Sequence, residues 1–490
     1  MLFNSYEFIL GFFPITVVGF FLIAAYNNKA AAVWLVMASL FFYGWWSITA
    51  VPLLLLSIFT NYIFGLIIAP RSEGKKALSE QIRKIYLCIA ITVNLTLLGF
   101  FKYSNFFITN VNTLLGVLQK PEISLLNIVL PVGVSFYTFT QIAFLVDCWQ
   151  GKVKSHNFIH YMLFVSYFPH LIAGPILHHA QIIPQFSKQQ TYKPNLDHIA
   201  SGIAIFAVGL GKKLLIADPL SEVADALFQP VASGVSPTFY SSWLGVLAFT
   251  FQIYFDFSGY SDMAIGLSLF FNIYLPINFN SPYKATSIID FWRRWHISLS
   301  TFLRDYLYIP LGGNRKGKMR RYLNLLITML LGGLWHGASW MYVLWGLAHG
   351  SLLIINNFWR SVVGEKQYSK LGQTICWAVT FLSICCTWVL FKAENIKVAH
   401  QIYRGMFGLN GNGTDNMQLF PTAAVGIAFL LAISNKNSQK IALGIENSKM
   451  SYFNYKNLSL TPTFAVCIGM LLFICLLKID VRSPFLYFQF

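Results

Sequence analysis

Long apolar segments recur along almost the whole chain, separated by short polar stretches. A helix needs roughly 20 mostly apolar residues to cross the hydrocarbon core of a bilayer, and many segments approach that length. They lie at Phe8–Tyr26, Ala31–Ser47, Val51–Ala69, Ile85–Phe101, Ile128–Val146, Phe158–Leu177, Ile199–Ile216, Ser241–Phe257, Asp262–Leu275, Tyr322–Leu334, Trp340–Phe358, Thr374–Leu390, Pro421–Ile433 and Thr463–Leu477. The pattern predicts an all-α polytopic membrane protein with about 11 to 13 crossings, in which the shortest segments are re-entrant or tilted.

Composition and charge agree with a lipid bilayer as the surroundings of the chain. Hydrophobic residues make up 56% of its 490 residues and charged residues only 11%, whereas soluble domains carry about 25% charged residues. The formal net charge of +17 is explained by basic loops on the cytoplasmic side of a membrane protein. We therefore expect no nucleic-acid partner.

The seven cysteines give no sign of a disulfide framework or a metal centre. All of them lie in or beside apolar segments, and no two form a C-x-x-C pair. They are typical of small packing residues. We expect no bound cofactor and no metal ligands.

A first polar cluster interrupts the apolar background at Tyr254-Phe-Asp-Phe-Ser-Gly-Tyr-Ser-Asp262. Asp256 and Asp262 flank Gly259, so we expect the helix to break there. The two carboxylates are either ligands for an ion or a substrate, or structural partners of arginines. Arg293, Arg294 and Arg304 are the available arginines, and pairing with them is the favoured interpretation.

A second cluster runs from Asp290 to Pro310 and contains Phe291-Trp-Arg-Arg-Trp-His-Ile-Ser298. At helical spacing Trp292 and His296 share one face. Mixed aromatic and arginine side chains also suit an amphipathic helix at the membrane interface. From these residues alone, His296 is either a packing residue or a functional one.

A third cluster, Gly332-Gly-Leu-Trp-His-Gly337, places His336 in an apolar, glycine-flanked tract. An ionisable residue inside a membrane segment is costly, so it is a candidate for function. The spacing to His349 is not that of two metal ligands on one helix, which lie three or four residues apart. A neutral imidazole can accept a proton, as acyl transfer to a hydroxyl requires. The alternative is a hydrogen-bonded contact between helices.

At these residues the chain resembles the membrane-bound O-acyltransferase family, and within it the bacterial branch that O-acetylates alginate. The resemblance rests on ordered landmarks: Leu130-Pro-Val-Gly-Val-Ser-Phe-Tyr-Thr138, Tyr254–Asp262, Phe291–Ser298, Arg304-Asp-Tyr-Leu-Tyr-Ile-Pro-Leu-Gly-Gly313 and Gly332–Gly337. One departure is His170 in Phe168-Pro-His-Leu, where that branch is expected to carry glutamine. The branch that D-alanylates teichoic acid shares the same core.

The resemblance also implies which residues form the active site. The essential histidine of the family falls on His336 and its polar partner on His296, so these are the expected catalytic residues. Arg293, Arg294 and Arg304, with Asp305 and Trp335, are candidates for binding the donor or the substrate. His336 is expected to act as general base, while His296 orients the donor or stabilises the oxyanion.

The resemblance also implies the setting of the reaction. We expect one membrane domain over residues 1–490, with a catalytic core near 128–358, in which helices enclose a tunnel. The expected donor is acetyl-CoA or another acetyl thioester. The expected partners are a periplasmic protein of the SGNH-hydrolase type and an exported polysaccharide such as alginate, at the bacterial cytoplasmic (inner) membrane.

Two alternatives remain open at this stage. One is D-alanyl transfer to teichoic acid by the related branch. The other is a transporter or flippase in which Asp256, Asp262 and the histidines form a proton or substrate path. Neither a G-x-S-x-G elbow nor a P-loop is present in the sequence, so a serine hydrolase and an ATP-driven pump are unsupported.

Overall fold

The computed structural model is helical throughout the part of the chain that it describes. That part comprises residues 1–70, 78–153, 157–172, 174–364, 368–413, 419–434, 436–443, 461–479 and 484–486, and it contains no strand. Six helical stretches within it are long and apolar enough to cross a membrane: Glu7–Ala24, Asn28–Trp46, Ile48–Ile68, Glu80–Val117, Leu196–Ala232 and Lys370–Lys392. The predicted class, an all-α polytopic membrane protein, is confirmed. The count of 11 to 13 crossings stays a prediction.

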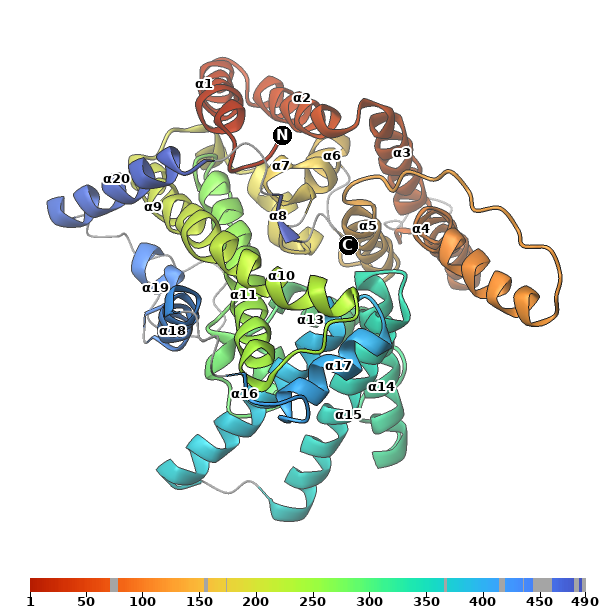
Figure 1. Ribbon diagram of the computed structural model, residues 1–490. Coiled ribbons are helices and arrows are strands. Elements are labelled where there is room, and N and C mark those ends of the chain that lie inside the picture. The colour runs from red at the N-terminus through yellow and green to blue at the C-terminus, as the bar shows by residue number, and fades with distance from the viewer. Residues whose placement is uncertain are drawn as a thin grey trace. The chain divides into compact units, whose positions relative to one another are not determined.

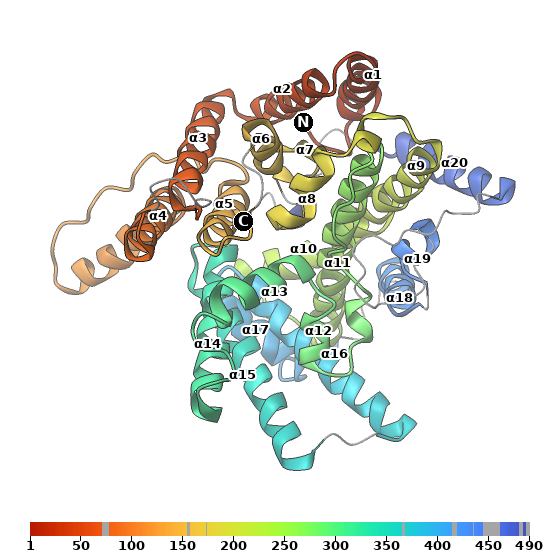
Figure 2. The ribbon, with the colours of Figure 1, turned by 180° about the vertical axis from the view of Figure 1, so that it is seen from behind.

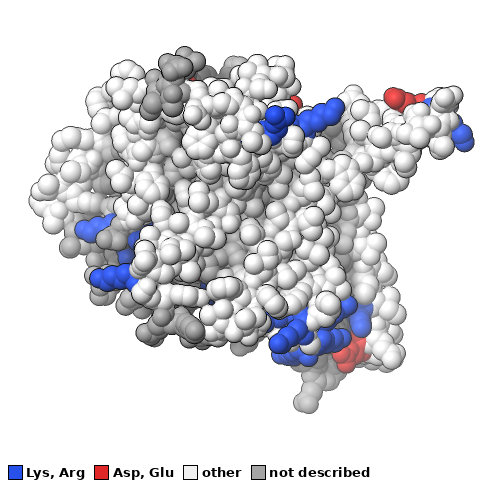
Figure 3. All heavy atoms as spheres, turned by 60° about the horizontal axis from the view of Figure 1, so that its bottom comes forward, with Lys and Arg blue, Asp and Glu red and all other residues white. Residues whose placement is uncertain are grey.

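The surface of these helices suits lipid. The first span exposes more than half of the Leu10, Ile15 and Leu22 side chains. Figure 3 shows a face on which lysine and arginine side chains form a few separate groups within a largely uncharged surface. Large apolar patches mark membrane or partner contacts, and their place on long helices indicates the hydrocarbon core of a bilayer.

The chain forms two compact units that are interleaved in sequence. Unit 1 comprises residues 1–202 and 264–276, and unit 2 comprises residues 203–263 and 277–490. The chain passes from one unit to the other within the helices α9 (Leu196–Gly211) and α11 (Phe239–Leu269), and again after Pro276. The expectation of one membrane domain with a core near residues 128–358 stays a prediction.

Unit 1 is built from the N-terminal helices. They are η1 (Glu7–Phe12), α1 (Phe13–Ala24), α2 (Asn28–Trp46), η2 (Ile48–Ala50), α3 (Val51–Ile68), α4 (Glu80–Val117), α5 (Val134–Trp149), α6 (Phe158–Ser166), α7 (Phe168–Leu171), α8 (His179–Phe186) and η3 (Gln189–Tyr192). α1 packs on α2, and α2 packs on α6. α3, α4 and α5 pack on one another (Figure 1).

Uncharged hydrogen bonds join the helices of unit 1. The amides of Asn61 on α3 and Asn94 on α4 donate to each other, with N–O distances of 3.2 and 2.6 Å. Gln141 of α5 donates to Ser57 Oγ at 2.8 Å and accepts from the Tyr161 hydroxyl at 3.2 Å. Such pairs satisfy polar groups that lipid cannot, and they hold membrane helices together.

Unit 2 contains the remaining helices. They are η4 (Lys212–Ala217), α10 (Asp218–Ala232), η5 (Pro282–Lys284), α12 (Ile288–Trp292), α13 (Ile297–Leu303), η6 (Arg304–Tyr308), α14 (Gly317–His336), α15 (Trp340–Val363), α16 (Lys370–Lys392), α17 (Ile396–Met406), α18 (Leu419–Ile433), α19 (Ser438–Leu443) and α20 (Pro462–Leu477). α14 and α15 form a hairpin and lie side by side (Figure 1, Figure 2). α15 also packs on α12 and α16.

The predicted break at Gly259 is wrong, because α11 runs without interruption from Phe239 to Leu269. Gly259 instead allows a close approach to Gly209 of α9. A Cβ atom on Gly259 would lie 2.7 Å from the Gly209 carbonyl oxygen, and one on Gly209 would lie 2.6 Å from the Gly259 oxygen. The glycine therefore serves helix packing, and α11 contains the first of the two predicted apolar segments and the second as far as Leu269.

Candidate active site

His336 lies at the end of α14 inside a cage of aromatic rings in unit 2. Only 5% of its surface is exposed. Its ring centroid lies 5.0 Å from that of Trp335, 5.1 Å from that of Trp345 on α15, and 5.1 Å from that of Phe391 on α16. Three helices thus fix the position of this imidazole.

The glycines around His336 bring α14 and α15 together. A Cβ atom on Gly333 would collide with the carbonyl oxygen of Tyr342, and one on Gly337 with the Tyr342 ring. These glycines therefore allow close packing of the two helices. The tight hairpin presses the Trp345 ring against His336.

His296 is fully buried at the start of α13. The helical spacing assumed for this region is wrong, because α12 ends at Trp292 and a turn precedes α13. His296 itself adopts the left-handed conformation, with φ +42° and ψ +56°, which a residue with a side chain rarely does. Backbone strain of this kind clusters at functional sites.

The Trp335 ring contacts both His296 and His336. Its ring centroid lies 6.1 Å from that of His296 and 5.0 Å from that of His336. The Phe257 ring on α11 lies nearly perpendicular to the His296 ring, with the ring centroids 4.7 Å apart. Three residues that the sequence suggests for the site, His296, Trp335 and His336, are therefore brought together within unit 2.

A side chain that sequence reasoning missed holds His296. Asn278 Oδ1 lies 3.1 Å from His296 Nδ1 and also accepts from the backbone N–H and the hydroxyl of Ser298, at 3.2 and 2.9 Å. Asn278 Nδ2 lies 3.4 Å from Ser261 Oγ on α11. Nothing in the pattern around Asn278 marks it, because the contact requires the turn that follows α12.

The predicted donor-binding arginines form local ion pairs. Arg294 Nε lies 2.9 Å from Asp290, four residues earlier on the chain. Arg304 Nε lies 2.6 Å from its neighbour Asp305, and its side chain is 55% exposed. Arg293 is exposed. Carboxylates thus already balance the charges of two of these side chains, and the donor-binding role of all three, like that of Asp305, stays a prediction.

Asp256 and Asp262 form buried ion pairs, as expected, but with lysines. Lys213 Nζ lies 2.8 Å from Asp256 Oδ1 and 2.8 Å from Asp218 Oδ1, and Lys212 Nζ lies 2.6 Å from Asp262 Oδ2. The expected arginine partners are therefore wrong. The π-helical turn η4 contains both lysines, so that two consecutive side chains reach carboxylates six positions apart on α11.

The C-terminal segment completes this ion-pair cluster. Asp256 Oδ2 accepts from the Leu486 backbone N–H at 3.0 Å, and Lys213 Nζ donates to the Pro484 carbonyl at 3.1 Å. Phe485 stacks edge-on against Tyr260 with ring centroids 4.8 Å apart. The carboxylates are thus structural partners within unit 2, which argues against the transporter alternative.

Comparison with known proteins decides the family. The family model described as "MBOAT, membrane-bound O-acyltransferase family" matches residues 40–395. The chain belongs to the membrane-bound O-acyltransferase family. It is therefore an acyltransferase, and the matched region includes His296, Trp335 and His336.

Relatives within this family act on different acceptors. The chain is 39% identical over 505 residues to a peptidoglycan O-acetyltransferase of Helicobacter pylori, covering 98% of this chain and 89% of that protein. It is 37% identical over 519 residues to a probable alginate O-acetylase of Azotobacter vinelandii, covering all of both chains. A teichoic acid D-alanyltransferase of Bacillus subtilis is 26% identical over 287 residues, covering 56% of this chain and 71% of that protein.

His349 is a further buried histidine next to the O-acyltransferase site. Its ring lies 4.6 Å from that of Trp345 and 5.1 Å from that of Trp292. Neither of its ring nitrogens has a hydrogen-bond partner among the described residues. Trp345 contacts both His349 and His336. His349 therefore helps to hold the Trp345 ring in its place beside His336.

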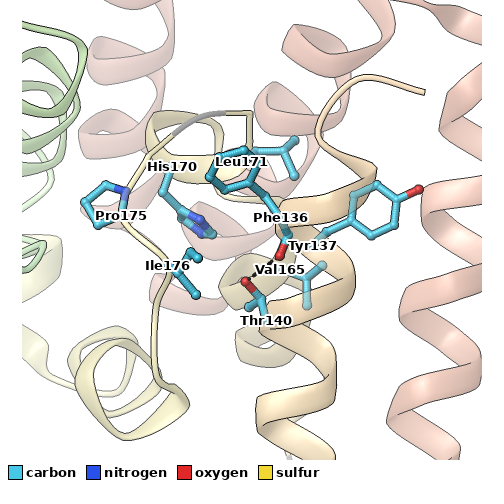
Figure 4. A pocket seen from close by; sticks show the side chains of 8 residues that line it. All are labelled: Phe136, Tyr137, Thr140, Val165, His170, Leu171, Pro175 and Ile176. Atoms are coloured by element: carbon cyan, nitrogen blue, oxygen red, sulfur yellow. Dashed lines mark hydrogen bonds between the residues drawn. The ribbon is translucent and has the colours of Figure 1, made fainter. Parts of the chain in front are cut away.

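Two other buried histidines, His170 and His179, lie in unit 1. His170 lines a small pocket with Thr140, Val165, Pro175 and Ile176 (Figure 4). His179 pairs with Asp147 at 2.8 Å and ties α8 to α5. Both are buried, and the contact with Asp147 gives His179 a structural role.

Proposed function

We propose that this protein is an O-acetyltransferase of the membrane that modifies hydroxyl groups of an exported polysaccharide. Relatives that cover nearly all of the chain are named as O-acetyl-transferring proteins for peptidoglycan and alginate. The observation that carries the proposal is the contact of both His336 and His296 with one tryptophan, Trp335, among buried aromatic rings. An acyl transfer between two substrates needs such a dry, fixed pair of polar groups.

His336 is the proposed general base. It takes the proton from the acceptor hydroxyl while the oxygen attacks the carbonyl carbon of an acetyl thioester. The C–S bond then breaks, the thiolate leaves, and the proton on His336 passes to it. The products are an acetate ester and a free thiol. The cage of Trp335, Trp345 and Phe391 excludes water, which would otherwise hydrolyse the thioester.

His296 is the proposed second polar group of the reaction. Its contact with Trp335 places it next to the ring that also touches His336. Its proposed role is either to orient the donor, for which acetyl-CoA is the proposed thioester, or to stabilise the oxyanion.

The proposed setting is the bacterial cytoplasmic (inner) membrane, with the donor entering from the cytoplasm. The acetyl group passes to the glycan directly or through a periplasmic partner of the SGNH-hydrolase type. An alginate-like or peptidoglycan acceptor is favoured over teichoic acid, because the D-alanyltransferase relative matches only about half of the chain.

Replacing His336 tests the proposal directly. We expect His336→Ala to lower acetyl transfer from labelled acetyl-CoA to the glycan by about 10²–10⁴-fold, the usual contribution of a general base. His400→Ala is the matched control, since His400 is an exposed histidine of α17 in the same unit and its loss should leave transfer unchanged. A folded, membrane-inserted His336→Ala protein that still acetylates glycan would contradict the proposal.

A further inference from the structure

The hydrogen bonds around Asn278 determine which of its side-chain atoms faces His296. The backbone N–H of Ser298 lies 3.2 Å from that atom. A backbone N–H can only donate, so the atom must be the amide oxygen Oδ1. Asn278 Nδ2, on the other side, reaches Ser261 Oγ at 3.4 Å.

This assignment fixes the proton on His296. Because Asn278 Oδ1 can only accept, the Nδ1 atom of His296 at 3.1 Å must carry the hydrogen. Burial in the protein interior lowers the pKa of His296 to about 3, so the ring is neutral. A neutral imidazole carries one hydrogen, and the other nitrogen, Nε2, therefore presents a lone pair.

Backbone hydrogen bonds hold the segment of Asn278 against the turn that carries His296. The Ile297 N–H donates to the Asn278 carbonyl oxygen at 3.0 Å, and the Asn280 N–H donates to that of Arg294 at 2.9 Å. These bonds tie the segment of Asn278 to the turn that carries His296. The left-handed conformation of His296 then aims its side chain at Asn278.

We propose that Asn278 is a positioning residue that locks His296 as a hydrogen-bond acceptor toward a substrate N–H or O–H. The inference rests on the proposed function and deepens it. Of the two roles that the family resemblance leaves for His296, orienting a substrate fits a lone pair on Nε2. Donation to the oxyanion does not fit, because that role needs a hydrogen on Nε2.

The groups packed around His296 make its charge sensitive to position 278. Phe257 of α11 and Trp335 of α14 contact its ring and carry no charge. Beyond Trp335 lies His336, which is the nearest titratable side chain along these contacts. On neighbouring positions, Arg293 is exposed, Arg294 is paired with Asp290, and Asp256 is paired with Lys213.

Two substitutions of Asn278, in the full-length protein in lipid nanodiscs, test the inference. The assay uses acetyl-CoA with alginate oligomers or peptidoglycan fragments, whichever the unchanged protein acetylates. Asn278→Leu removes the acceptor for Nδ1–H, so we expect KM for one substrate to rise about tenfold, as for one lost hydrogen bond, with kcat within a few-fold. A rise in KM for acetyl-CoA assigns the bond to the donor, and a rise for the glycan assigns it to the hydroxyl.

Asn278→Asp keeps the oxygen but adds a charge. A carboxylate beside His296 favours the imidazolium, whose Nε2 carries a hydrogen and cannot accept. We therefore expect near-normal KM at neutral pH and a KM that rises as the pH falls, at a pH about 1–3 units higher than in the unchanged protein. Asn280→Asp is the matched control, because it adds the same charge two residues away, at an amide whose oxygen accepts from Asn437 Nδ2 at 3.1 Å.

The outcomes separate this inference from the proposed function. A fall in kcat with both KM values unchanged, or an Asn278→Asp protein that gains activity at low pH, overturns the acceptor role of His296. Wild-type kinetics for both Asn278 variants overturn it as well. If the unchanged protein transfers no acetyl group, or if His336→Ala is fully active, the proposed function fails instead.

Discussion

The two units solve the problem of buried polar groups in different ways. Between α3 and α4, unit 1 uses neutral amides, the reciprocal pair of Asn61 and Asn94, and its buried carboxylate Asp147 lies at the end of α5, where it pairs with His179. Unit 2 uses full charges: Lys213 lies between Asp218 and Asp256, and Lys212 pairs with Asp262. A neutral group that loses its partner costs far less than a buried charge that does.

The buried ion pairs formed by Lys212 and Lys213 lie in the unit that contains the candidate active site. α11 presents Asp256 and Asp262 to the lysines, while Phe257 contacts His296 and Ser261 contacts Asn278. The ion pairs therefore fix the helix that backs the site. Buried ion pairs thus hold α11 in place behind the site, whereas the neutral pair of Asn61 and Asn94 joins two helices of unit 1.

The largest loss of folding stability is expected for Lys213→Met. Lys213 and Asp256 are each only 3% exposed, so the substitution leaves two carboxylates without their shared cation. Removing one partner of a buried ion pair costs about 3–5 kcal/mol. Denaturant or thermal unfolding of the purified protein should show a loss of stability of this size, together with loss of acetyl transfer.

The double variant Lys213→Met, Asp256→Leu is the control for that prediction. Replacing a buried pair by apolar side chains is often neutral or stabilising. We expect it to recover much of the lost stability, although Asp218 and the Leu486 N–H each still lose a partner. A double variant as unstable as Lys213→Met would show that the charge of Asp256 is not the cause.

These ion pairs also mark the limit of what the sequence reveals. The hydropathy pattern predicted the long helices. The family resemblance predicted His336 and His296 as site residues, and both contact the Trp335 ring in the structure. Pairing of Asp256 and Asp262 with basic residues was predictable from the cost of a buried charge. The identity of the partners was not, because it depends on a π-helical turn within an apolar segment.

The role of Asn278 could not be predicted from the sequence for a similar reason. Its contact with His296 requires α12 to end at Trp292 and His296 to adopt a left-handed conformation. Helical periodicity argues against both events. The unbroken course of α11 was missed because Gly259 signals a break equally well as a close helix contact.

A smaller loss of folding stability is expected for Lys212→Met. This variant tests the ion pair of Lys212 against that of Lys213 within unit 2. Asp262 keeps a hydrogen bond from Gln439 Nε2 at 2.9 Å, so one partner remains after the substitution. We expect a loss of about 1.5–3 kcal/mol, the range for a hydrogen bond to a charged group. Unfolding measured beside Lys213→Met checks the order, and an equal or larger loss for Lys212→Met would contradict it.

The smallest effect is expected in unit 1, for the pair of Asn61 and Asn94. Polar contacts between membrane helices are worth about 0.6 kcal/mol on average by double-mutant cycles, since unfolded helices find other partners in the membrane. A cycle of Asn61→Leu, Asn94→Leu and both together should give a coupling near this value, with acetyl transfer retained. A coupling as large as that between Lys213 and Asp256 would mean that neutral pairs specify structure as strongly as charges do, and the contrast between the two units would fail.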